Sequence, residues 1–341
     1  MRILVTGGAG FIGSNFVRHV LSDSYPFFSG AEVTVLDKLT YAGTTGSLVA
    51  VENDPRLTFV HGDICDEELV RDLMDGVSTV VHCAAESHVD RSITDSGGFV
   101  RTNVLGTHTL LLQALESRVE RFVLVSTDEV YGTLDSGSWT EDQPLEPNSP
   151  YSASKSGADL LARAFHRTYG MRVCVTRCAN NYGPFQFPEK MIPLFTTNLL
   201  DGLPVPVYGD GGNVREWIHV DDHCRALALA AEHGRAGEVY NIGGTAELRN
   251  IDVTEAILKA LGRDRSMVRY VQDRKGHDRR YSVDDAKAVR ELGYAPSIRF
   301  EDGLERTVSW YADNRWWWEP LKERFVPPAG RTHPVPPGAA L

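Results

Sequence analysis

Arg2-Ile-Leu-Val-Thr-Gly-Gly-Ala-Gly-Phe-Ile-Gly13 is the stretch that decides the fold. Residues 2–6 form an apolar run without alternation, which is typical of a buried parallel strand, and a helical pattern follows through residues 16–20. Two glycine spacings fit the turn between them, G-x-x-G-x-x-G from Gly7 and G-x-G-x-x-G from Gly8. Such glycines let a pyrophosphate approach bare backbone at a helix N-terminus. The turn therefore predicts a dinucleotide site, with a plain strand–helix turn as the alternative.

Further strands are predicted at residues 32–36, 57–61, 79–83, 121–126 and 173–177, separated by helical patterns. Alternation of this kind predicts an α/β protein with a Rossmann-type doubly wound parallel sheet. Asp37 ends the second strand, where a carboxylate accepts hydrogen bonds from an adenosine ribose and repels a 2′-phosphate. We therefore expect NAD rather than NADP as the cofactor. The later loops, Gly62-Asp63-Ile64 and Ala84-Ala85-Glu86-Ser87, are expected to border it.

Thr127, Asp128 and Glu129 follow the strand at 121–126. Ligands bind outside the carboxyl ends of strands in open α/β sheets, so two adjacent carboxylates there suggest chemistry. The alternative is a solvated loop or a helix cap. Adjacent residues of a strand point to opposite faces, so both carboxylates can reach one substrate only if the strand ends or bends at Asp128.

Pro150 opens a predicted amphipathic helix that runs to Tyr169. Tyr151 and Lys155 are four residues apart in its first turns and share one face. An ammonium beside a phenol favours the phenolate and lowers the pKa of the tyrosine. Tyr151 is therefore a candidate base near neutral pH.

Composition narrows the class of protein. The chain has 341 residues, 42% hydrophobic content and a net charge of −11, which argues against nucleic acid and anionic membranes as partners. Its five cysteines form no C-x-x-C pair, so we expect a reducing compartment, the cytoplasm, and no zinc site. We expect no signal peptide, and no apolar run reaches 18 residues.

The amino-acid composition changes near Gly183, where prolines and glycines become frequent. We expect a cofactor domain at 1–182, a smaller C-terminal substrate-binding α/β domain at 183–325 with segments returning to the sheet, and a mobile tail at 326–341. Arg215 and the basic cluster at 274–280 suggest a phosphate site, with a solvated charged loop as the alternative.

Two other motifs have plainer interpretations. His219-Val-Asp-Asp-His223 suggests a metal site, but it lacks a third ligand, and we favour Asp221 or Asp222 as a helix N-cap. No metal is expected. The run Trp316-Trp317-Trp318 is expected to pack a terminal helix rather than stack on a ligand.

Taken in order, these motifs resemble the extended short-chain dehydrogenase/reductase superfamily. The segment Thr127-Asp128-Glu129-Val130-Tyr131-Gly132 resembles the dTDP-glucose 4,6-dehydratases within it, and the likeness extends over about residues 1 to 320. Later segments fit as well: Lys190-Met191-Ile192-Pro193, Val207-Tyr208-Gly209, Arg215-Glu216-Trp217 and residues 273–281. Related epimerases and decarboxylases usually have small hydroxyl residues in place of Asp128 and Glu129, so this pair is the most discriminating feature.

The resemblance implies a reaction. Tyr151 takes the proton of the hexose 4-hydroxyl while NAD takes hydride from C4; Lys155 holds the nicotinamide ribose, and Thr127 bonds the 4-oxygen. Glu129 then removes the C5 proton, and Asp128 protonates the departing 6-hydroxyl. NADH returns its hydride to C6, so the cofactor can stay bound.

The resemblance also implies binding residues. The cofactor would contact Gly7, Gly10, Phe11, Ile12, Gly13, Asp37, Lys38, Thr40, Asp63, Ile64, Ala84, Ala85, Ser87, Thr102, Tyr151, Lys155 and Asn181. The substrate, dTDP-glucose, would contact Ser87, Thr127, Asp128, Glu129, Asn180, Lys190, Met191, Pro206, Tyr208, Arg215, Asn250, Arg274 and His277. Lys275 departs from the family, which has proline there. The helices at 99–116 and 150–169 would form the four-helix interface of a homodimer.

Two alternatives stay open at the level of sequence. An epimerase or decarboxylase of the same fold would have no need for Asp128 and Glu129. A non-catalytic dinucleotide-sensing regulator would tolerate changes at Tyr151 and Lys155.

Overall fold

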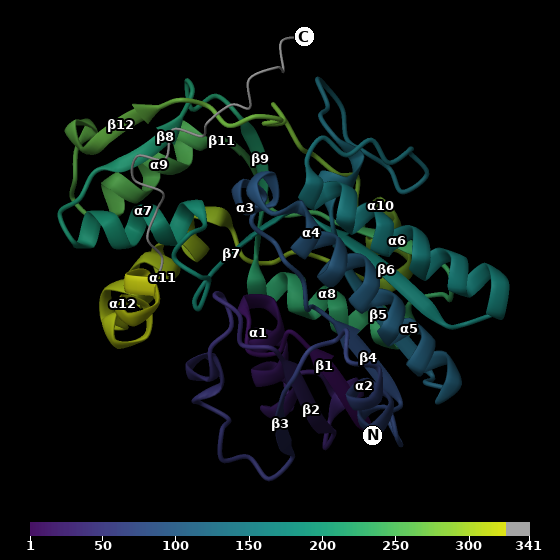
Figure 1. Ribbon diagram of the computed structural model, residues 1–341. Helices are drawn as coiled ribbons and strands as arrows, with labels where there is room; N and C mark the ends of the chain where they lie inside the picture. Colours follow the sequence, from purple (N-terminus) through teal and green to yellow (C-terminus); the bar gives the residue numbers. More distant parts are fainter. Residues whose placement is uncertain (325–341) are drawn as a thin grey trace.

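A seven-stranded parallel sheet lies at the centre of the molecule (Figure 1), a computed structural model that describes residues 1–324. The strand order is β3-β2-β1-β4-β5-β6-β10. The bounds are β1 (Arg2–Thr6), β2 (Glu32–Asp37), β3 (Leu57–His61), β4 (Thr79–His82), β5 (Arg121–Thr127), β6 (Val173–Cys178) and β10 (Val239–Ile242). The order reverses between β1 and β4, which is where an open α/β sheet binds its ligand. The predicted Rossmann-type sheet is therefore confirmed, and six of its strands match the predicted ones to within one residue.

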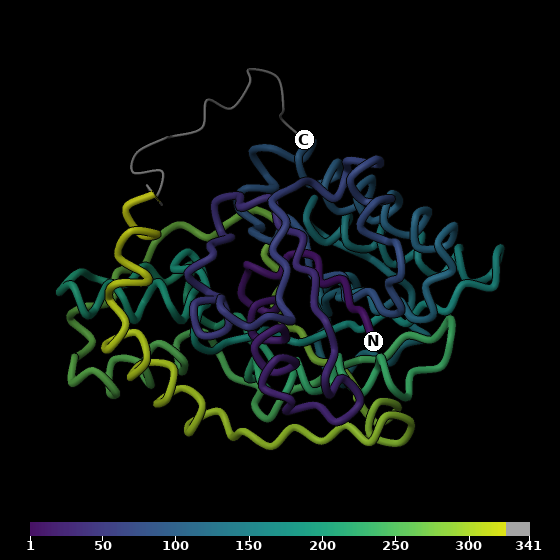
Figure 2. Tube along the Cα trace, turned by 90° about the horizontal axis from the view of Figure 1, so that it is seen from below, coloured from purple at the N-terminus to yellow at the C-terminus, as the bar shows by residue number. Residues whose placement is uncertain are grey.

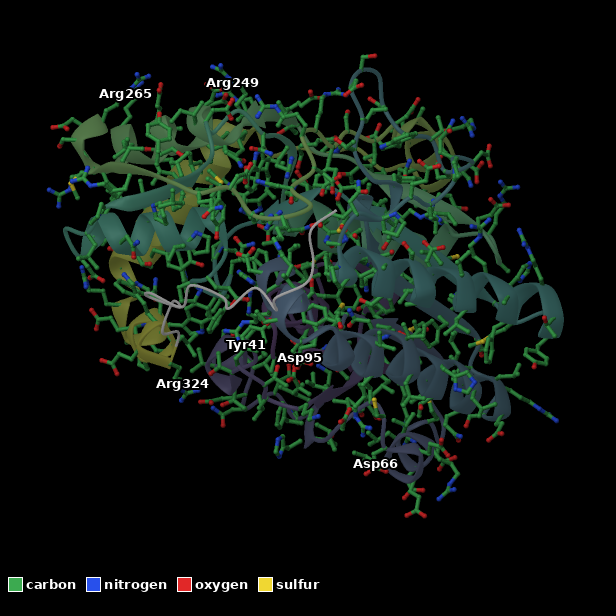
Figure 3. All side chains as sticks on the ribbon, turned by 45° about the horizontal axis from the view of Figure 1, so that its top comes forward. Tyr41, Asp66, Asp95, Arg249, Arg265 and Arg324 are labelled. Atoms are coloured by element: carbon green, nitrogen blue, oxygen red, sulfur yellow. The ribbon has the colours of Figure 1, made fainter. Side chains whose placement is uncertain are left out.

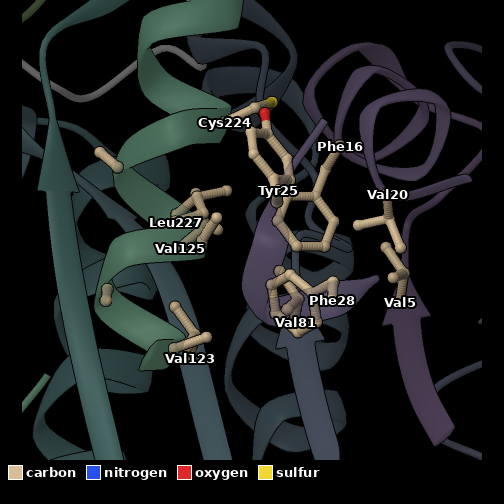
Figure 4. Close-up of a cluster of buried hydrophobic side chains, with 14 of the residues drawn as sticks. Val5, Phe16, Val20, Tyr25, Phe28, Val81, Val123, Val125, Cys224 and Leu227 are labelled. Carbon is tan, nitrogen blue, oxygen red and sulfur yellow. The ribbon is translucent and has the colours of Figure 1, made fainter. Parts of the chain in front are cut away.

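Helices cover both faces of this sheet. One face carries α1 (Phe11–Leu21), α8 (Val220–His233) and α10 (Ala286–Leu292); the other carries α2 (Glu67–Leu73), α5 (Thr107–Glu116) and α6 (Pro150–Tyr169). Figure 4 shows the first layer, where Val5, Val81 and Val125 from three strands meet Phe16 of α1 and Leu227 of α8. Their strand neighbours point the other way, into the second layer, because successive strand residues alternate between faces.

The predicted single helix at 99–116 is wrong in one respect. The structure divides this stretch into α4 (Ser96–Phe99), a π-helical segment η3 (Val100–Gly106) and α5, preceded by α3 (Val89–Thr94). The wider turn places the buried side chain of Asn103 between the loop after β4 and helix α6: it accepts from the Glu86 amide (2.9 Å) and donates to the Ser154 hydroxyl (2.8 Å). Apolar periodicity does not encode such a local widening.

A second region packs above the carboxyl edge of the sheet (Figure 1). It contains a three-stranded sheet, β11-β9-β7, and a parallel pair, β12-β8. Its elements are β7 (Asn180–Tyr182), α7 (Met191–Leu200), β8 (Val205–Tyr208), β9 (Val214–His219), β11 (Ala246–Arg249), α9 (Asn250–Ala260), β12 (Val268–Val271) and α11 (Phe300–Asp313). The short 3₁₀ segments of the chain are η1 (Pro26–Phe28), η2 (Thr45–Leu48), η4 (Asp128–Tyr131) and η5 (Arg265–Met267).

The last described helix, α12 (Arg315–Arg324), lies beside α11 at one side of the molecule (yellow in Figure 2). Trp317 and Trp318 are buried and pack with Phe185 and Tyr311, which confirms the packing prediction for these two residues. Trp316 is 54% exposed and does not share that role. The tail predicted at 326–341 falls outside the described residues.

The motif His219–His223 is a helix start, but the predicted cap was wrong. His219 itself is the N-cap of α8, and its Nδ1 accepts from the Asp221 amide (3.2 Å). A buried histidine ring can take this role because the neutral imidazole offers one acceptor nitrogen. Residues 1–324 contain no group of three or more His, Cys, Asp or Glu side chains that could hold a metal. Within the same range no helix is long and apolar enough to cross a membrane.

Candidate active site

The predicted site residues converge because five parallel strands end at one edge of the sheet. Strand pairing brings Thr6 level with Leu36 and with His82, and His82 level with Leu124. Asp37 and Thr127 end β2 and β5, and Gly7, Asp63 and Ala84 lie one or two residues beyond the ends of β1, β3 and β4. Residues separated by more than a hundred positions in the chain thus face the same space.

The glycine turn is too close to its neighbours for any side chain. Gly7 has φ +68°, and a Cβ on it would lie 2.6 Å from the Ala84 backbone. A Cβ on Gly13 would lie 2.3 Å from the Gly7 carbonyl oxygen. Helix α1 begins after Gly10 with no side-chain cap, so its first amide groups point outward unpaired by a side chain. This is a cradle that fits a dinucleotide pyrophosphate, with Phe11 and Ile12 in the first turn.

Asp37 is held in place by backbone. Its carboxylate accepts from the amides of Ala9 (2.9 Å) and Leu39 (2.8 Å), and burial raises its pKa against the effect of these bonds. Next to it, Lys38 donates to Asp63 (2.7 Å), so the two predicted cofactor loops are tied together. The arrangement fits a ribose that donates its hydroxyls to a fixed carboxylate, with Thr40 exposed beside it.

The acidic pair lies where the strand stops. β5 ends at Thr127, and the 3₁₀ segment η4 begins at Asp128, which is the bend that both carboxylates require to share one side. The Thr127 hydroxyl accepts from the Glu129 amide (3.2 Å) and donates to Asp128 Oδ1 (3.2 Å). Asp128 is buried, and its Oδ2 has no hydrogen-bond partner within the described chain.

The two carboxyls differ in their electrostatic surroundings. Burial, then the nearby Glu129 and Glu216, raise the pKa of Asp128 well above its usual range. Burial also raises the pKa of Glu129, but Arg274, Arg215 and Lys190 act against that rise. Asp128 is therefore the better candidate for a protonated acid and Glu129 for an ionised base.

The prediction that Lys155 lowers the pKa of Tyr151 is wrong for this structure. Burial, followed by the carboxylate of Glu129, raises the pKa of Tyr151 well above its usual range. Lys155 Nζ instead donates to the Val125 carbonyl (2.6 Å), and burial lowers the pKa of Lys155 to about 8. The physical reason is that sequence spacing places the two groups on one helix face but does not show that acids lie nearer to the phenol.

Three predicted substrate residues gather around Glu129. Lys190 Nζ donates to the Ser87 carbonyl (2.6 Å). The Arg215 guanidinium lies over the Tyr281 ring (4.2 Å to the centroid) and donates to the Asp278 carbonyl (2.9 Å). Arg274 lies 3.9 Å from Asp90, and its Nε has no hydrogen-bond partner within the described chain. All three cations act to lower the pKa of Glu129.

The other predicted substrate residues lie around this group. Tyr208 donates to Asp90 (3.2 Å), and its ring meets that of His277 edge to face. Met191 opens α7, Pro206 lies in β8, Asn180 opens β7 and Asn250 opens α9. Asn180 Nδ2 and Asn250 Oδ1 are buried atoms without a hydrogen-bond partner among the described residues. Asn181 is held by His223 (2.8 Å), whose Nδ1 contacts its Oδ1.

Sequence reasoning missed several residues of this site. Asp90 joins Tyr208 to Arg274, although nothing in its helix sequence marks it. Tyr41 lies under the Arg91 guanidinium (3.7 Å to the ring centroid). In the view of Figure 3, Tyr41 is seen between Asp66, the N-cap of α2, and Arg249 and Arg265 of the second region. The signal that could have found Tyr41 is its place three residues after Lys38, in the loop that follows β2.

Comparison with known proteins identifies the family of the chain. The family model for GDP-mannose 4,6-dehydratase matches residues 4–307. A dTDP-glucose 4,6-dehydratase from Streptomyces antibioticus is 61% identical over 96% of the chain and 98% of its own length. A dTDP-glucose 4,6-dehydratase from Streptomyces venezuelae, solved with NAD bound, is 63% identical, covers 94% of this chain and 100% of its own, and has a TM-score of 0.93.

The epimerases of the same fold are more distant. A UDP-glucose 4-epimerase from Thermotoga maritima is 33% identical, covers 92% of this chain and 100% of its own, and has a TM-score of 0.85. The shared fold therefore extends to epimerases, whereas identity near 60% is found with dehydratases.

Proposed function

The chain belongs to the dTDP-glucose 4,6-dehydratases of the extended short-chain dehydrogenase/reductase superfamily, and we propose that its reaction is carried by Thr127, Asp128, Glu129, Tyr151 and Lys155. It is an NAD-dependent hydro-lyase that converts dTDP-glucose to dTDP-4-keto-6-deoxyglucose, a precursor of deoxysugars. The observation that carries our assignment is the acidic pair at the end of β5, set between Tyr151 and three basic side chains.

Tyr151 and Lys155 serve the first step. NAD, when bound, accepts the hydride from C4 of the hexose and later returns it to C6. Tyr151 receives the proton of the 4-hydroxyl, and the Thr127 hydroxyl orients the 4-oxygen. Burial and Glu129 favour the protonated phenol, so Tyr151 works as a base only where a cation acts against them; we assign that part to Lys155, on the same helix face.

Glu129 and Asp128 serve the elimination. Glu129 takes the proton from C5, which the 4-ketone has made acidic, and Asp128 gives a proton to the leaving 6-hydroxyl. The two roles need one ionised and one protonated carboxyl at the same pH. Burial and neighbouring acids raise the pKa of Asp128, whereas three cations act to lower the pKa of Glu129, and this difference supports the division.

The sugar nucleotide would lie against the second region. Arg215 and Arg274 would pair with its diphosphate, because guanidinium forks match phosphate oxygens. We divide the chain accordingly into a cofactor and catalytic part at 1–182 and a mainly substrate-binding part at 183–325. Within the second part, β10 belongs to the large sheet and α8 packs on it, which supports a division in which some later segments return to that sheet.

We further propose a cytoplasmic homodimer. All five cysteines are free thiols, as in a reducing compartment. Val100, Leu105 and Leu160 are 45–54% exposed on neighbouring segments η3 and α6, and such apolar side chains are what a helical interface would cover.

The test of the assignment is Glu129→Gln assayed with dTDP-glucose deuterated at C4. In the unmodified enzyme we expect loss of water with the deuterium retained in the sugar. In the variant we expect no water loss but near-normal cofactor content, because the amide cannot take a proton. The matched control is Glu146→Gln, an exposed glutamate, which should react like the unmodified enzyme. Full turnover by Glu129→Gln would refute the role of Glu129, and formation of an epimer without mass loss would refute the dehydration itself.

A further inference from the structure

One buried arginine contacts both segments that carry the proposed catalytic residues, α6 and η4. Arg177, on β6, is completely buried. Its Nε and Nη2 donate to the two oxygens of Asp159 (2.8 and 3.0 Å), a fully buried carboxylate on α6. Its Nη1 donates to the Tyr131 hydroxyl (2.7 Å) and to the Glu141 carbonyl (3.3 Å). Every nitrogen of the guanidinium therefore has a partner.

These contacts reach the segments that carry the reacting groups. Asp159 lies four residues beyond Lys155 and eight beyond Tyr151, on the same face of α6. Tyr131 is the last residue of η4, the four-residue 3₁₀ turn that begins with Asp128 and Glu129. Strand pairing sets Arg177 beside Ser126, just before that turn. One side chain thus touches both the tyrosine helix and the acid turn without touching the reacting atoms.

Tyr131 is also fixed from its other side. Its hydroxyl donates to Asn241 Oδ1 (2.7 Å), and its ring stacks on Trp139 (centroids 5.8 Å apart, planes 19° apart). Asn241 in turn donates to the Trp139 carbonyl (2.8 Å). The phenol is therefore a rigid link, whereas a turn of only four residues has little regular structure of its own to hold Asp128 and Glu129.

We infer that Arg177, acting through Tyr131 and Asp159, is a positioning residue that sets the acid turn against the tyrosine helix. The inference rests on the proposed roles of the acidic pair and of Tyr151. Oxidation at C4 uses groups on α6, while elimination uses groups on η4, so both steps act on one sugar only if the two segments keep a fixed separation. Misplacement by about 1 Å can cost a step as much as about a hundredfold in rate.

If Arg177 and Asp159 formed only a structural ion pair, a different result would be expected. Losing a buried hydrogen bond for stability alone would slow both steps together or neither. Loosening η4 while α6 keeps its own contacts should slow elimination and leave oxidation nearly unchanged. The reduced cofactor formed in the first step would then accumulate, because the sugar that must take the hydride back is formed late.

The experiment uses Tyr131→Phe in the full-length enzyme, which removes only the hydroxyl and leaves the Arg177–Asp159 pair intact. The control is Tyr294→Phe, another buried tyrosine, whose hydroxyl donates to the Gly243 carbonyl (2.6 Å) away from both segments. A single turnover with dTDP-glucose is followed by the near-ultraviolet absorbance of the reduced nicotinamide and by mass spectrometry for water loss. Thermal unfolding of both variants reports the cost to stability.

For Tyr131→Phe we expect formation of reduced cofactor within about twofold of the unmodified rate and its decay, with water loss, slowed about tenfold. Tyr294→Phe should show neither change at a similar loss of thermal stability. Arg177→Lys, which keeps a cation for Asp159 but lacks the planar guanidinium, should likewise slow the decay of reduced cofactor more than its formation.

Equal slowing of both phases, or no slowing, in Tyr131→Phe would overturn the inference. Failure of the proposed function looks different, since the unmodified enzyme itself would then release no water. If Arg177→Lys does not fold, Tyr131→Phe decides alone.

Discussion

Replacing Asp128 by asparagine tests whether this buried carboxyl is protonated in the folded enzyme. The side chain is buried at the end of β5, and its Oδ2 has no hydrogen-bond partner within the described chain. Burial and two nearby glutamates raise its pKa well above the usual range, so the folded enzyme keeps this proton where the unfolded chain has lost it. Asparagine is nearly isosteric with the protonated acid and does not titrate. It should leave the fold intact and end water loss, because an amide does not give up its proton to a leaving group.

The magnitude follows from proton linkage. An unfolded aspartate loses its proton near pH 4, at about 3.9, whereas folded Asp128 holds its proton until the raised pKa is reached. Between these two values the folded state binds one proton more, so the free energy of unfolding falls as pH rises, by about 1.4 kcal/mol for each pH unit. Asp128→Asn removes this loss. Relative to the unmodified enzyme the variant should therefore gain stability as pH rises above about 4, by up to about 1.4 kcal/mol for each pH unit.

Urea unfolding of the enzyme without substrate, repeated at several pH values between about 5 and 7, measures this slope. Other buried or half-buried acids that do not act on Asp128, such as Glu189 and Glu86, contribute equally to both proteins, so the difference belongs to Asp128. Asp210→Asn is the control. Asp210 is exposed, Arg279 lowers its pKa to about 2, and it is ionised in both states throughout this range. Parallel curves for Asp128→Asn and the unmodified enzyme would refute the protonated acid, whatever the variant's activity.

Two further predictions concern the cofactor and the assembly. Asp37→Asn removes the negative charge at the proposed ribose site. The dissociation constant for NAD should therefore rise about tenfold, while NADP should bind better than before. Calorimetric titration that shows an unchanged ratio of NAD to NADP affinity would contradict this. Leu160→Asp puts a charge on the exposed apolar side of α6 and should give a monomer in sedimentation. The control, Leu203→Asp, changes a similarly exposed position after α7 and should leave the assembly unchanged. If neither variant changes the assembly, α6 is not part of the interface.

The sequence contains enough to predict the large sheet. Apolar runs without alternation mark buried parallel strands, and each predicted strand was found within one residue of its place. The end of β5 could also be expected to matter, because a carboxylate pair at the carboxyl edge of a sheet has no packing role. Whether both acids share a side could not be predicted: it depends on the strand giving way to a 3₁₀ turn at Asp128.

What could not be predicted depends on contacts between distant segments. The spacing of Tyr151 and Lys155 is correct, but the pKa of the phenol is set by burial and by carboxylates that arrive from another element. The cap of α8 was assigned to the aspartates by residue preference, and the histidine before them took the role. The π-helical turn at 100–106 likewise depends on the bonds of Asn103 to Glu86, in a loop, and to Ser154, in α6, and not on local periodicity.

Some buried polar atoms without a hydrogen-bond partner lie at the proposed substrate site and are better explained by substrate binding than by stability. A buried donor or acceptor without a partner costs about 1–3 kcal/mol, so a fold selected only for stability would pair each one. In the described chain such atoms include Asp128 Oδ2, Asn180 Nδ2, Asn250 Oδ1 and Arg274 Nε, which come from four different segments and all belong to the predicted substrate set. Asn180 Nδ2 and Arg274 Nε are donors suited to phosphate or carbonyl oxygens, Asn250 Oδ1 is an acceptor for a hydroxyl or imide, and Asp128, when protonated, donates from Oδ2. A sugar nucleotide offers both kinds along its length, so its binding can recover a cost that the folded chain alone carries.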